Sequence, residues 1–294
     1  MGTPKLVRVT NVEEFVKELG KLRLKSGRMR FFRGHPDYKR QRIRPKIYRH
    51  GYRQVLENES SSIQEATIRS PSDFPESCTF FEKLVKLQHY GLPTRLLDVT
   101  SNALAALYFA CREREHTEGE VIVFDIPVGH VKYYNSDTVA LIANLARRPS
   151  AFDVKTLPEE EAAFKKDAEV ERLLYDIRED KPSFLSRINR EDLSRVLCVR
   201  VKLDNARLVR QDGAFLLFGI RNQKKRCAHV PEDWVTFGNE RRRIICSRKY
   251  RIKKQLEQFG ISEERLFPEL EYQTEAVIAR FARKYKRKAK RHDR

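Results

Sequence analysis

The part of the sequence that most constrains the fold is a helix–strand–helix pattern in its first half. Apolar side chains in residues 80–88 recur at helical spacing, and Gly91 with Pro93 then prevents the helix from continuing. Residues 94–99 can follow only as an extended segment. The next helix, which is predicted to be capped by Thr100 or Ser101 and runs to Cys111, is apolar on both faces. A helix of that kind is buried, so we expect helices packed against a sheet.

The rest of the chain alternates between helical and strand-like patterns. Helices are predicted for residues 11–25, within 136–178, for 249–259 and for a last stretch carrying Leu270, Val277 and Phe281. Strands are predicted for residues 29–33, 121–124, 197–201, 214–218 and 243–246. This alternation is typical of a mixed α+β fold.

The sequence predicts one domain and no membrane segment. No repeat, linker or low-complexity stretch interrupts residues 11–280, so we predict an N-terminal extension over 1–10, one domain over 11–280 and a basic tail over 281–294. There is no apolar run of membrane length and no signal-peptide pattern, which predicts a cytoplasmic protein without a membrane partner. Five cysteines without C-x-x-C spacing predict reduced thiols and no metal site.

Positive charge is concentrated in two segments. The chain has 60 Lys and Arg against 41 Asp and Glu, a net charge of +19. Residues 38–53 carry seven Lys or Arg and no acid, and residues 280–294 carry nine against one Asp. Localised charge of this kind indicates a polyanionic partner. A solubilising tail is the alternative reading of the second segment.

Tyrosines interleave with the cations of residues 38–53, which is the composition of a groove that pairs with phosphates and stacks on bases. Simple packing of the tyrosines is the alternative. The residues predicted to bind nucleic acid are Arg40, Arg42, Arg44, Tyr48, Arg49, Lys284 and Arg287.

Common catalytic signatures are missing from the sequence. It has no P-loop, no H-E-x-x-H, no G-x-S-x-G and no G-x-G-x-x-G after a strand. Its aspartates share no spacing typical of a metal-dependent nuclease. These absences argue against the commonest nucleotide-binding and hydrolytic sites.

Three strings resemble the FRG-domain family of bacterial and phage proteins. They are Phe-Arg-Gly-His at 32–35, Arg-Pro-Lys-Ile-Tyr-Arg at 44–49 and the long string Gln-His-Tyr-Gly-Leu-Pro-Thr-Arg-Leu-Leu-Asp-Val-Thr at 88–100. Further likeness lies in residues 106–110, 211–215 and 260–270, so the resemblance runs from about 11 to 275. Val99 departs from it, because the family often has Trp there. Membership implies an association with anti-phage defence.

The order of elements also resembles that of ADP-ribosyltransferases, more distantly. A strand ends in Arg33-Gly34, an extended segment ends in Asp98-Val99-Thr100-Ser101, and a helix of the form Ala-Leu-Tyr-Phe-Ala follows. This resemblance implies a central split β-sheet surrounded by helices, with NAD as the substrate. It implies a toxin or anti-phage effector, and the cationic segments suggest nucleic acid as acceptor.

The resemblance implies roles for individual residues. Arg33 would clamp pyrophosphate or ribose, Asp98 would orient Arg33 or Arg95, and Thr100 would support the ribose. The residues that would bind NAD are Arg33, Gly34, His35, His89, Tyr90, Thr100 and Ser101. The late acid of such enzymes stays open among Gln211, Asp212 and Glu240. Purely structural roles compete at each position.

Two alternatives to a transferase remain open. The first is a non-catalytic module whose basic segments hold nucleic acid. The second is a subunit whose basic tail binds an acidic protein, such as an antitoxin or a defence-complex protein.

Overall fold

The computed structural model describes residues 5–40, 43–185, 188–202, 205–237, 240–270, 272–274 and 277–278. Its strands are β1 (Lys5–Val9), β2 (Arg28–His35), β3 (Leu96–Thr100), β4 (Gly119–Pro127), β5 (Val131–Tyr133), β6 (Val196–Arg200), β7 (Gly213–Phe218), β8 (Thr236–Phe237) and β9 (Glu240–Cys246). Its α-helices are α1 (Val12–Gly20), α2 (Arg53–Glu57), α3 (Glu59–Arg69), α4 (Phe80–His89), α5 (Ala103–Arg112), α6 (Asp137–Asn144), α7 (Glu161–Lys165), α8 (Ala168–Asp180), α9 (Ala206–Arg210), α10 (Lys249–Gln258) and α11 (Glu263–Leu266).

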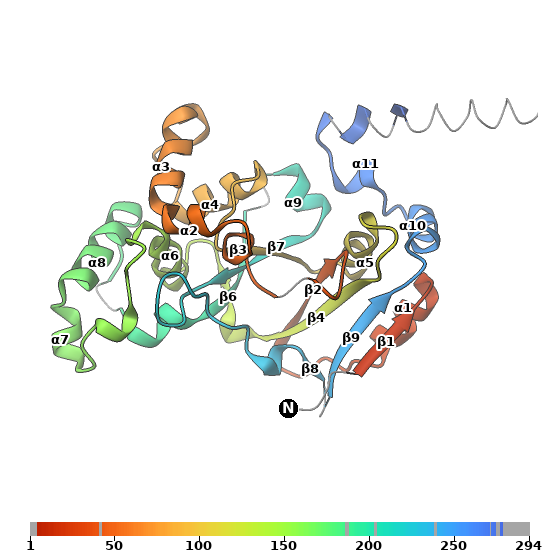
Figure 1. The fold of residues 1–294 in the computed structure, drawn as a ribbon, viewed down its shortest axis with the longest axis horizontal. Helices are drawn as coiled ribbons and strands as arrows, with labels where there is room; N and C mark the ends of the chain where they lie inside the picture. The colour runs from red at the N-terminus through yellow and green to blue at the C-terminus, as the bar shows by residue number, and fades with distance from the viewer. Residues whose placement is uncertain are drawn as a thin grey trace, which may run out of the picture.

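One mixed sheet runs through the molecule in the order β1-β9-β4-β2-β3-β7-β6-β5, and β8 pairs with β9 (Figure 1). The inner pairings are antiparallel, whereas β1 is parallel to β9 and β5 is parallel to β6. Together the sheet and its helices form a single mixed α+β fold, as the sequence predicts, although the described helices cover one face of the sheet and do not surround it.

The sheet is almost divided between β2 and β3. β2 pairs with β4 along its whole length, and β3 does the same with β7. Between β2 and β3 the register contains one pair, Phe32 with Thr100. The two halves are therefore joined at one point and diverge beyond it, which agrees with the predicted split.

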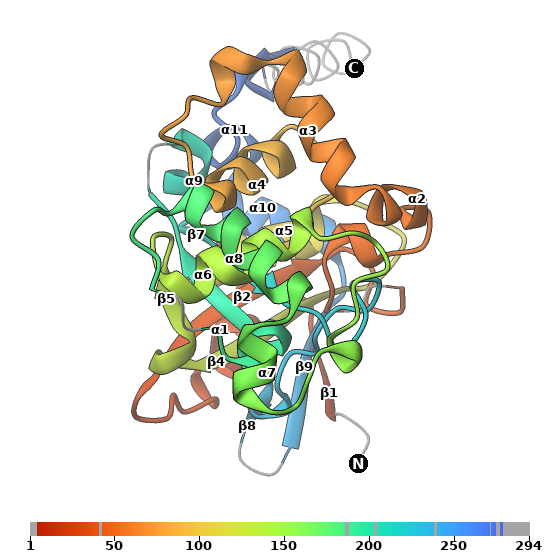
Figure 2. The same cartoon turned by 90° about the vertical axis from the view of Figure 1, so that its left-hand side faces the viewer.

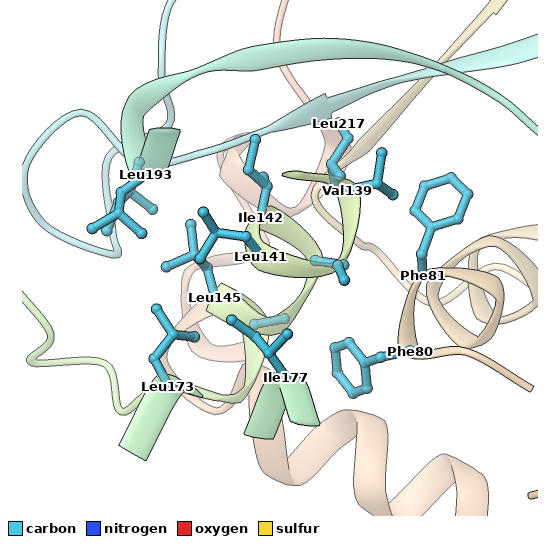
Figure 3. Close-up of a cluster of buried hydrophobic side chains, with 14 of the residues drawn as sticks. Phe80, Phe81, Val139, Leu141, Ile142, Leu145, Leu173, Ile177, Leu193 and Leu217 are labelled. Carbon is cyan, nitrogen blue, oxygen red and sulfur yellow. The ribbon is translucent and has the colours of Figure 1, made fainter. Parts of the chain in front are cut away.

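Two helical layers cover the same face of the two halves. α4, α6 and α8 pack on β3, β7 and β6 through a cluster that includes Phe81, Ile142 and Leu217 (Figure 3), and Figure 2 shows α6 and α8 in front of the sheet. α1, α5 and α10 pack on β2, β4 and β9. Phe32 belongs to the second layer and Leu96 to the first, and the pairing of Phe32 with Thr100 places both on one face. The sheet split therefore lies under the gap between the layers.

The opposite face carries one continuous core. Side chains from both halves of the sheet, among them Phe124, Leu97 and Phe218, pack with the buried indole of Trp234. This core spans the split, so the two halves are held together from behind while the helical layers leave the front accessible.

The predicted start of one helix shifts in the structure. The helix after β3 is capped by Asn102, whose Oδ1 accepts from the amides of Leu104 (3.0 Å) and Ala105 (3.1 Å), so the prediction of Thr100 or Ser101 as the cap was wrong. Thr100 is still part of β3. The helix itself is buried, as predicted.

The two ends of the sequence differ in how well their pattern predicts structure. Residues 5–9, which the sequence analysis leaves outside the domain, form β1 beside β9. The last predicted helix and the basic tail fall largely outside the described residues. Among the described helices, none has the length and apolar content needed to cross a membrane.

Gly34 of β2 lets α5 lie directly on the sheet. An added Cβ at Gly34 would stand 2.0 Å from the carbonyl oxygen of Ala106 and 2.5 Å from the amide nitrogen of Ala110. Because both are backbone atoms of α5, the helix would have to move. Gly34→Ala is therefore expected to lower the free energy of unfolding by about 1–3 kcal/mol, measured by chemical denaturation.

The control for this prediction is Gly20→Ala at the end of α1. A Cβ added there meets nothing within 4 Å, and alanine favours a helix by roughly 0.5–1 kcal/mol. This variant should be neutral or slightly stabilised. An unchanged free energy of unfolding in Gly34→Ala would contradict the close approach of α5.

Candidate functional site

A cleft of about 850 Å³ opens where β2 and β3 diverge. β3 and the end of β2 form its floor, α4 forms one wall, and Phe109 and Arg112 of α5 lie on the other side. Residues from the segment 46–49 and from α9 complete the lining. Figure 1 shows α4 to the left and α5 to the right of β2. The volume is typical of small-molecule sites.

Arg33 lies at the split itself. Its Nη1 donates to the main-chain carbonyl of Asp98 and stands 3.6 Å from Asp98 Oδ2, while its Nε donates to Nε2 of His35 (3.0 Å). The guanidinium thus donates a hydrogen bond to a main-chain carbonyl of β3, at a point where β3 no longer pairs with the main chain of β2. Its side chain is 15% exposed and lines the cleft. Burial lowers the pKa of Arg33 to about 10, against the effect of Asp98, so the group stays charged at neutral pH.

Asp98 is held by a relay from α4 and the loop after it. Thr94 Oγ1 donates to Gln88 Oε1 (2.6 Å), and Gln88 Nε2 donates to Asp98 Oδ1 (3.0 Å). The carboxylate is still 65% exposed and lies in the cleft. Of the two arginines predicted as partners of Asp98, Arg33 is the one in contact.

His35 lies behind Arg33 and does not line the cleft. The ring is fully buried, and its Nδ1, which stands 3.8 Å from Glu120 Oε2, has no hydrogen-bond partner within the described residues. Burial lowers the pKa of His35 to about 4, so the ring is neutral. Since Nε2 accepts from Arg33, the proton lies on Nδ1. His35 therefore positions Arg33 in place of contacting a ligand.

Most cations of the cleft have a carboxylate partner. Lys86 pairs with Asp73 at 2.8 Å, and Lys202 pairs with Glu82 at the same distance. Arg112 of α5 is likewise engaged by an acid of α11 at 3.0 Å. These ion pairs leave little uncompensated positive charge to bind an anionic ligand.

Lys46 and Arg49 are different, because neither forms an ion pair with a described carboxylate. The Arg49 guanidinium donates only long hydrogen bonds, 3.3 and 3.4 Å, to the carbonyl of Arg44. Lys46 Nζ lies 5.3 Å from the ring centroid of Tyr52. Burial and the charge of Arg44 lower the pKa of Arg49. Together with Arg33, these two side chains make one end of the cleft electropositive.

His89 and Tyr90 line the cleft at the end of α4. Their rings meet edge to face with centroids 5.1 Å apart. Tyr90 is 72% exposed, so its ring is free to cover a bound ring system.

The remaining predicted residues at the adjacent ends of β3 and β7 are either bonded within the fold or lie outside the cleft. Thr100 lines the cleft, but its hydroxyl donates to the carbonyl of Gln211 (2.5 Å) and accepts from the amide of Asn102 (2.9 Å). Gln211 also lines it, with Nε2 donating to the carbonyl of Leu266 (3.0 Å). Ser101 and Asp212 are exposed and are not part of the lining.

Glu240 begins β9, and its side chain lies outside the described part of the structure. In the sheet, Gly34 aligns with Val121 and Val121 with Ile244. Glu240 is four residues before Ile244, roughly 13 Å along the strand and away from the end of β2 that forms the cleft. This placement separates its backbone from Arg33.

The predicted nucleic-acid residues are scattered. Arg49 lines the cleft, and Arg40 is an exposed side chain 3.7 Å from Asp37. Arg44 is half-buried. The Tyr48 hydroxyl donates to the carbonyl of Lys224 (3.2 Å), which turns the ring inward and leaves it unsuited to stack on a base. Arg42, Lys284 and Arg287 lie outside the described residues.

Two residues of the cleft and one buried arginine have roles that the sequence pattern does not indicate. Lys46 and Gln88 lie in the cleft, and both belong to strings that carry the family resemblance. Arg95 of the same long string is fully buried and pairs with Glu59, so its task is structural. Membership in a motif does not separate these roles, because the direction of each side chain depends on the fold.

No metal site is evident in the described part of the chain. Among these residues, no group of His, Cys, Asp and Glu side chains is arranged to hold a metal ion. The five cysteines form no disulfide.

Comparison with known proteins identifies a family for one part of the chain. No curated protein and no solved structure matches it. The model of the FRG domain family matches residues 28–119, a narrower span than the resemblance read from the motifs. This span runs from β2 to the start of β4 and contains Arg33, Arg49, Asp98 and α5. Residues 28–119 therefore match the FRG domain, and this stretch supplies the floor and much of the wall of the cleft.

Proposed function

We propose that the cleft binds NAD and that the protein transfers ADP-ribose from it to a nucleic acid, as a toxin or anti-phage effector. The observation that carries this proposal is the charged, partly exposed Arg33 in the sheet split, with Lys46 and Arg49 beside it, neither of which pairs with a described carboxylate. Arg33 itself faces only the exposed carboxylate of Asp98, so the three cations together favour a pyrophosphate as the ligand group.

The rest of the lining fits the other parts of a dinucleotide. The exposed carboxylate of Asp98 is held at the cleft by Gln88, within reach of hydroxyl groups on a ribose. Tyr90 offers an exposed ring for an aromatic base. Thr100 and Ser101 do not fit the roles that the ADP-ribosyltransferase resemblance implies, because the first hydroxyl is bonded within the fold and the second lies outside the lining.

Two features support nucleic acid as the acceptor. The net charge of the chain is +19, and two cations of the basic segment 38–53, Lys46 and Arg49, line the cleft. A cationic approach concentrates a polyanion at the site and speeds its association.

The direct test uses the full chain with NAD labelled in its adenylate phosphate and either single-stranded RNA or DNA. We expect release of nicotinamide and transfer of label to the nucleic acid. NAD should also raise the melting temperature, since a ligand of the folded state stabilises it. Absence of nicotinamide release, label transfer and thermal stabilisation would overturn the proposal.

A second candidate is a non-catalytic module that binds nucleic acid. It is favoured by the lining of the cleft, which Asp212, one of the acids considered for catalysis, does not join. Such a module would bind nucleic acid with a steep salt dependence, weakened by charge reversal at Arg40 and Arg44, and would show no response to NAD.

A further inference from the structure

A carboxylate stands directly behind one wall of the cleft without any hydrogen bond of its own. Both carboxylate oxygens of Glu269 are buried and have no hydrogen-bond partner within the described residues. The nearest charged or titratable groups are His89, with Nε2 3.6 Å from Oε1, and Arg207, with Nη1 3.7 Å from the same oxygen. A buried carboxylate without hydrogen bonds is costly, so its retention here calls for an explanation.

Three elements bring these groups together. α4 ends at His89, α9 carries Arg207, and Glu269 follows α11; the three helices gather at the same end of the molecule in Figures 1 and 2. The Arg207 guanidinium also lies 4.7 Å from the ring centroid of the buried Phe267. His89 lines the cleft, whereas Glu269 does not, so the imidazole stands between the carboxylate and the ligand space.

We propose that His89 is the proton acceptor of the transfer reaction and that Glu269 is the residue that positions it. This assignment rests on the proposed function. With Nε2 turned to Glu269, the neutral ring keeps its proton there, and Nδ1, which has no hydrogen bond among the described residues, is left to accept one. The order of groups is that of a catalytic base with a carboxylate behind it, although at 3.6 Å the contact is an ion-pair distance and not a hydrogen bond.

The proposed step balances as follows. An acceptor hydroxyl forms a bond from its oxygen to the anomeric carbon of the nicotinamide ribose, and the bond from that carbon to the nicotinamide nitrogen breaks, its electron pair staying on the nitrogen. The hydroxyl proton moves to Nδ1 of His89, and the imidazolium is stabilised by Glu269 until it returns the proton to water.

The charges facing His89 suit this task. Burial and the charge of Arg207 lower the pKa of His89, while Glu269 acts in the opposite sense. The ring is therefore neutral before the step, and the imidazolium formed in the step gains the attraction of Glu269. Among the groups that the sequence leaves open as the late acid, none has this relation to the cleft.

The test compares Glu269→Gln and His89→Gln with wild type in the full chain, by the pH dependence of label transfer. Glu269→Gln should reduce kcat about tenfold or more and move the acidic limb of the profile to lower pH, with NAD affinity unchanged, and His89→Gln should remove that limb and about a hundredfold of the rate. NMR titration should show a lower His89 pKa in Glu269→Gln. Glu257→Gln, which removes an exposed acid paired with Lys254, is the matched control and should change neither profile nor pKa.

The outcomes separate the two proposals. A wild-type chain that does not consume NAD overturns the proposed function, and the base assignment falls with it. An active wild type whose variants keep the wild-type rate and profile overturns the assignment of His89 and Glu269 alone. Thermal unfolding of each variant shows whether it is folded, and Glu269→Gln, which conserves shape, serves where His89→Gln does not fold.

Discussion

Replacing Glu59 by glutamine is expected to lower the free energy of unfolding by about 3–5 kcal/mol, because it removes the one carboxylate in a buried cluster with two cations. Glu59 Oε1 accepts from Arg95 Nε (3.0 Å), and Oε2 lies 3.4 Å from Lys224 Nζ. All three side chains are buried. Burial disfavours the charged form of Arg95, but the attraction of Glu59 is the stronger effect and raises the pKa of Arg95. Chemical denaturation measures the loss.

The same variant should show a particular pH dependence. Burial lowers the pKa of Lys224 to about 8, and Glu59 opposes that shift. Without Glu59 the folded-state pKa falls further below the unfolded value, so the folded variant releases the Lys224 proton at lower pH than wild type. Stability rises with pH wherever the unfolded chain binds more protons, so the deficit of Glu59→Gln should narrow between about pH 6 and 8.

The matched control is Glu65→Gln on the same helix. Glu65 pairs with Arg69 one turn away, and both side chains are exposed, so the change should cost no more than about 0.5 kcal/mol. Equal losses in the two variants would show that Glu59 is not a buried counter-charge.

The cluster also explains why Arg95, one of the two arginines considered as partners of Asp98, does not contact it. Arg95 comes directly before β3 and is fully buried against Glu59, whereas Asp98 within β3 is exposed in the cleft beside Arg33. The sequence shows both residues but not the partner Glu59, which belongs to another helix 36 residues earlier. Pairing across such a distance follows from the packing of α3 against the sheet, which local patterns do not contain.

The fold was likewise predictable where it depends on residues close in sequence, and not where it depends on distant partners. The buried helix α5 and the position of Arg33 near a strand end were predictable, because they depend on periodicity and on turn residues close in sequence. β1 was not, since a five-residue strand that pairs with β9 gains its stability from a partner at the other end of the chain.

The candidate site was predictable at its centre and not at its edges. The hydroxyl of Thr100 is taken by the carbonyl of Gln211, and this depends on the register between β3 and β7. Glu269 lies within the family-like residues 260–270, but no role for it could be predicted, because its contact with His89 depends on how the segment after α11 returns to α4.

Arg33→Lys is expected to reduce kcat/KM for NAD by about a hundredfold or more, equivalent to roughly 2.7 kcal/mol of transition-state stabilisation. Lysine keeps the charge but not the planar fork, and the Arg33 fork reaches both the Asp98 carbonyl and Nε2 of His35 while facing the cleft. A single ammonium cannot hold both contacts and also bind a pyrophosphate in a fixed direction. Label transfer and isothermal titration with NAD measure the loss.

Arg28→Lys is the matched control, because Arg28 lies on the same strand and also bonds a main-chain carbonyl and a carboxylate. It donates to the carbonyl of Asp125 (2.8 Å) and to Oδ2 of Asp233 (2.5 Å), at the end of β2 away from the cleft. Both variants lose a similar set of hydrogen bonds, so a similar loss of stability is expected in each. Only Arg33→Lys should lose the binding and turnover of NAD. If the two variants bind and turn over NAD alike, then Arg33 holds the split sheet together and does not act on the ligand.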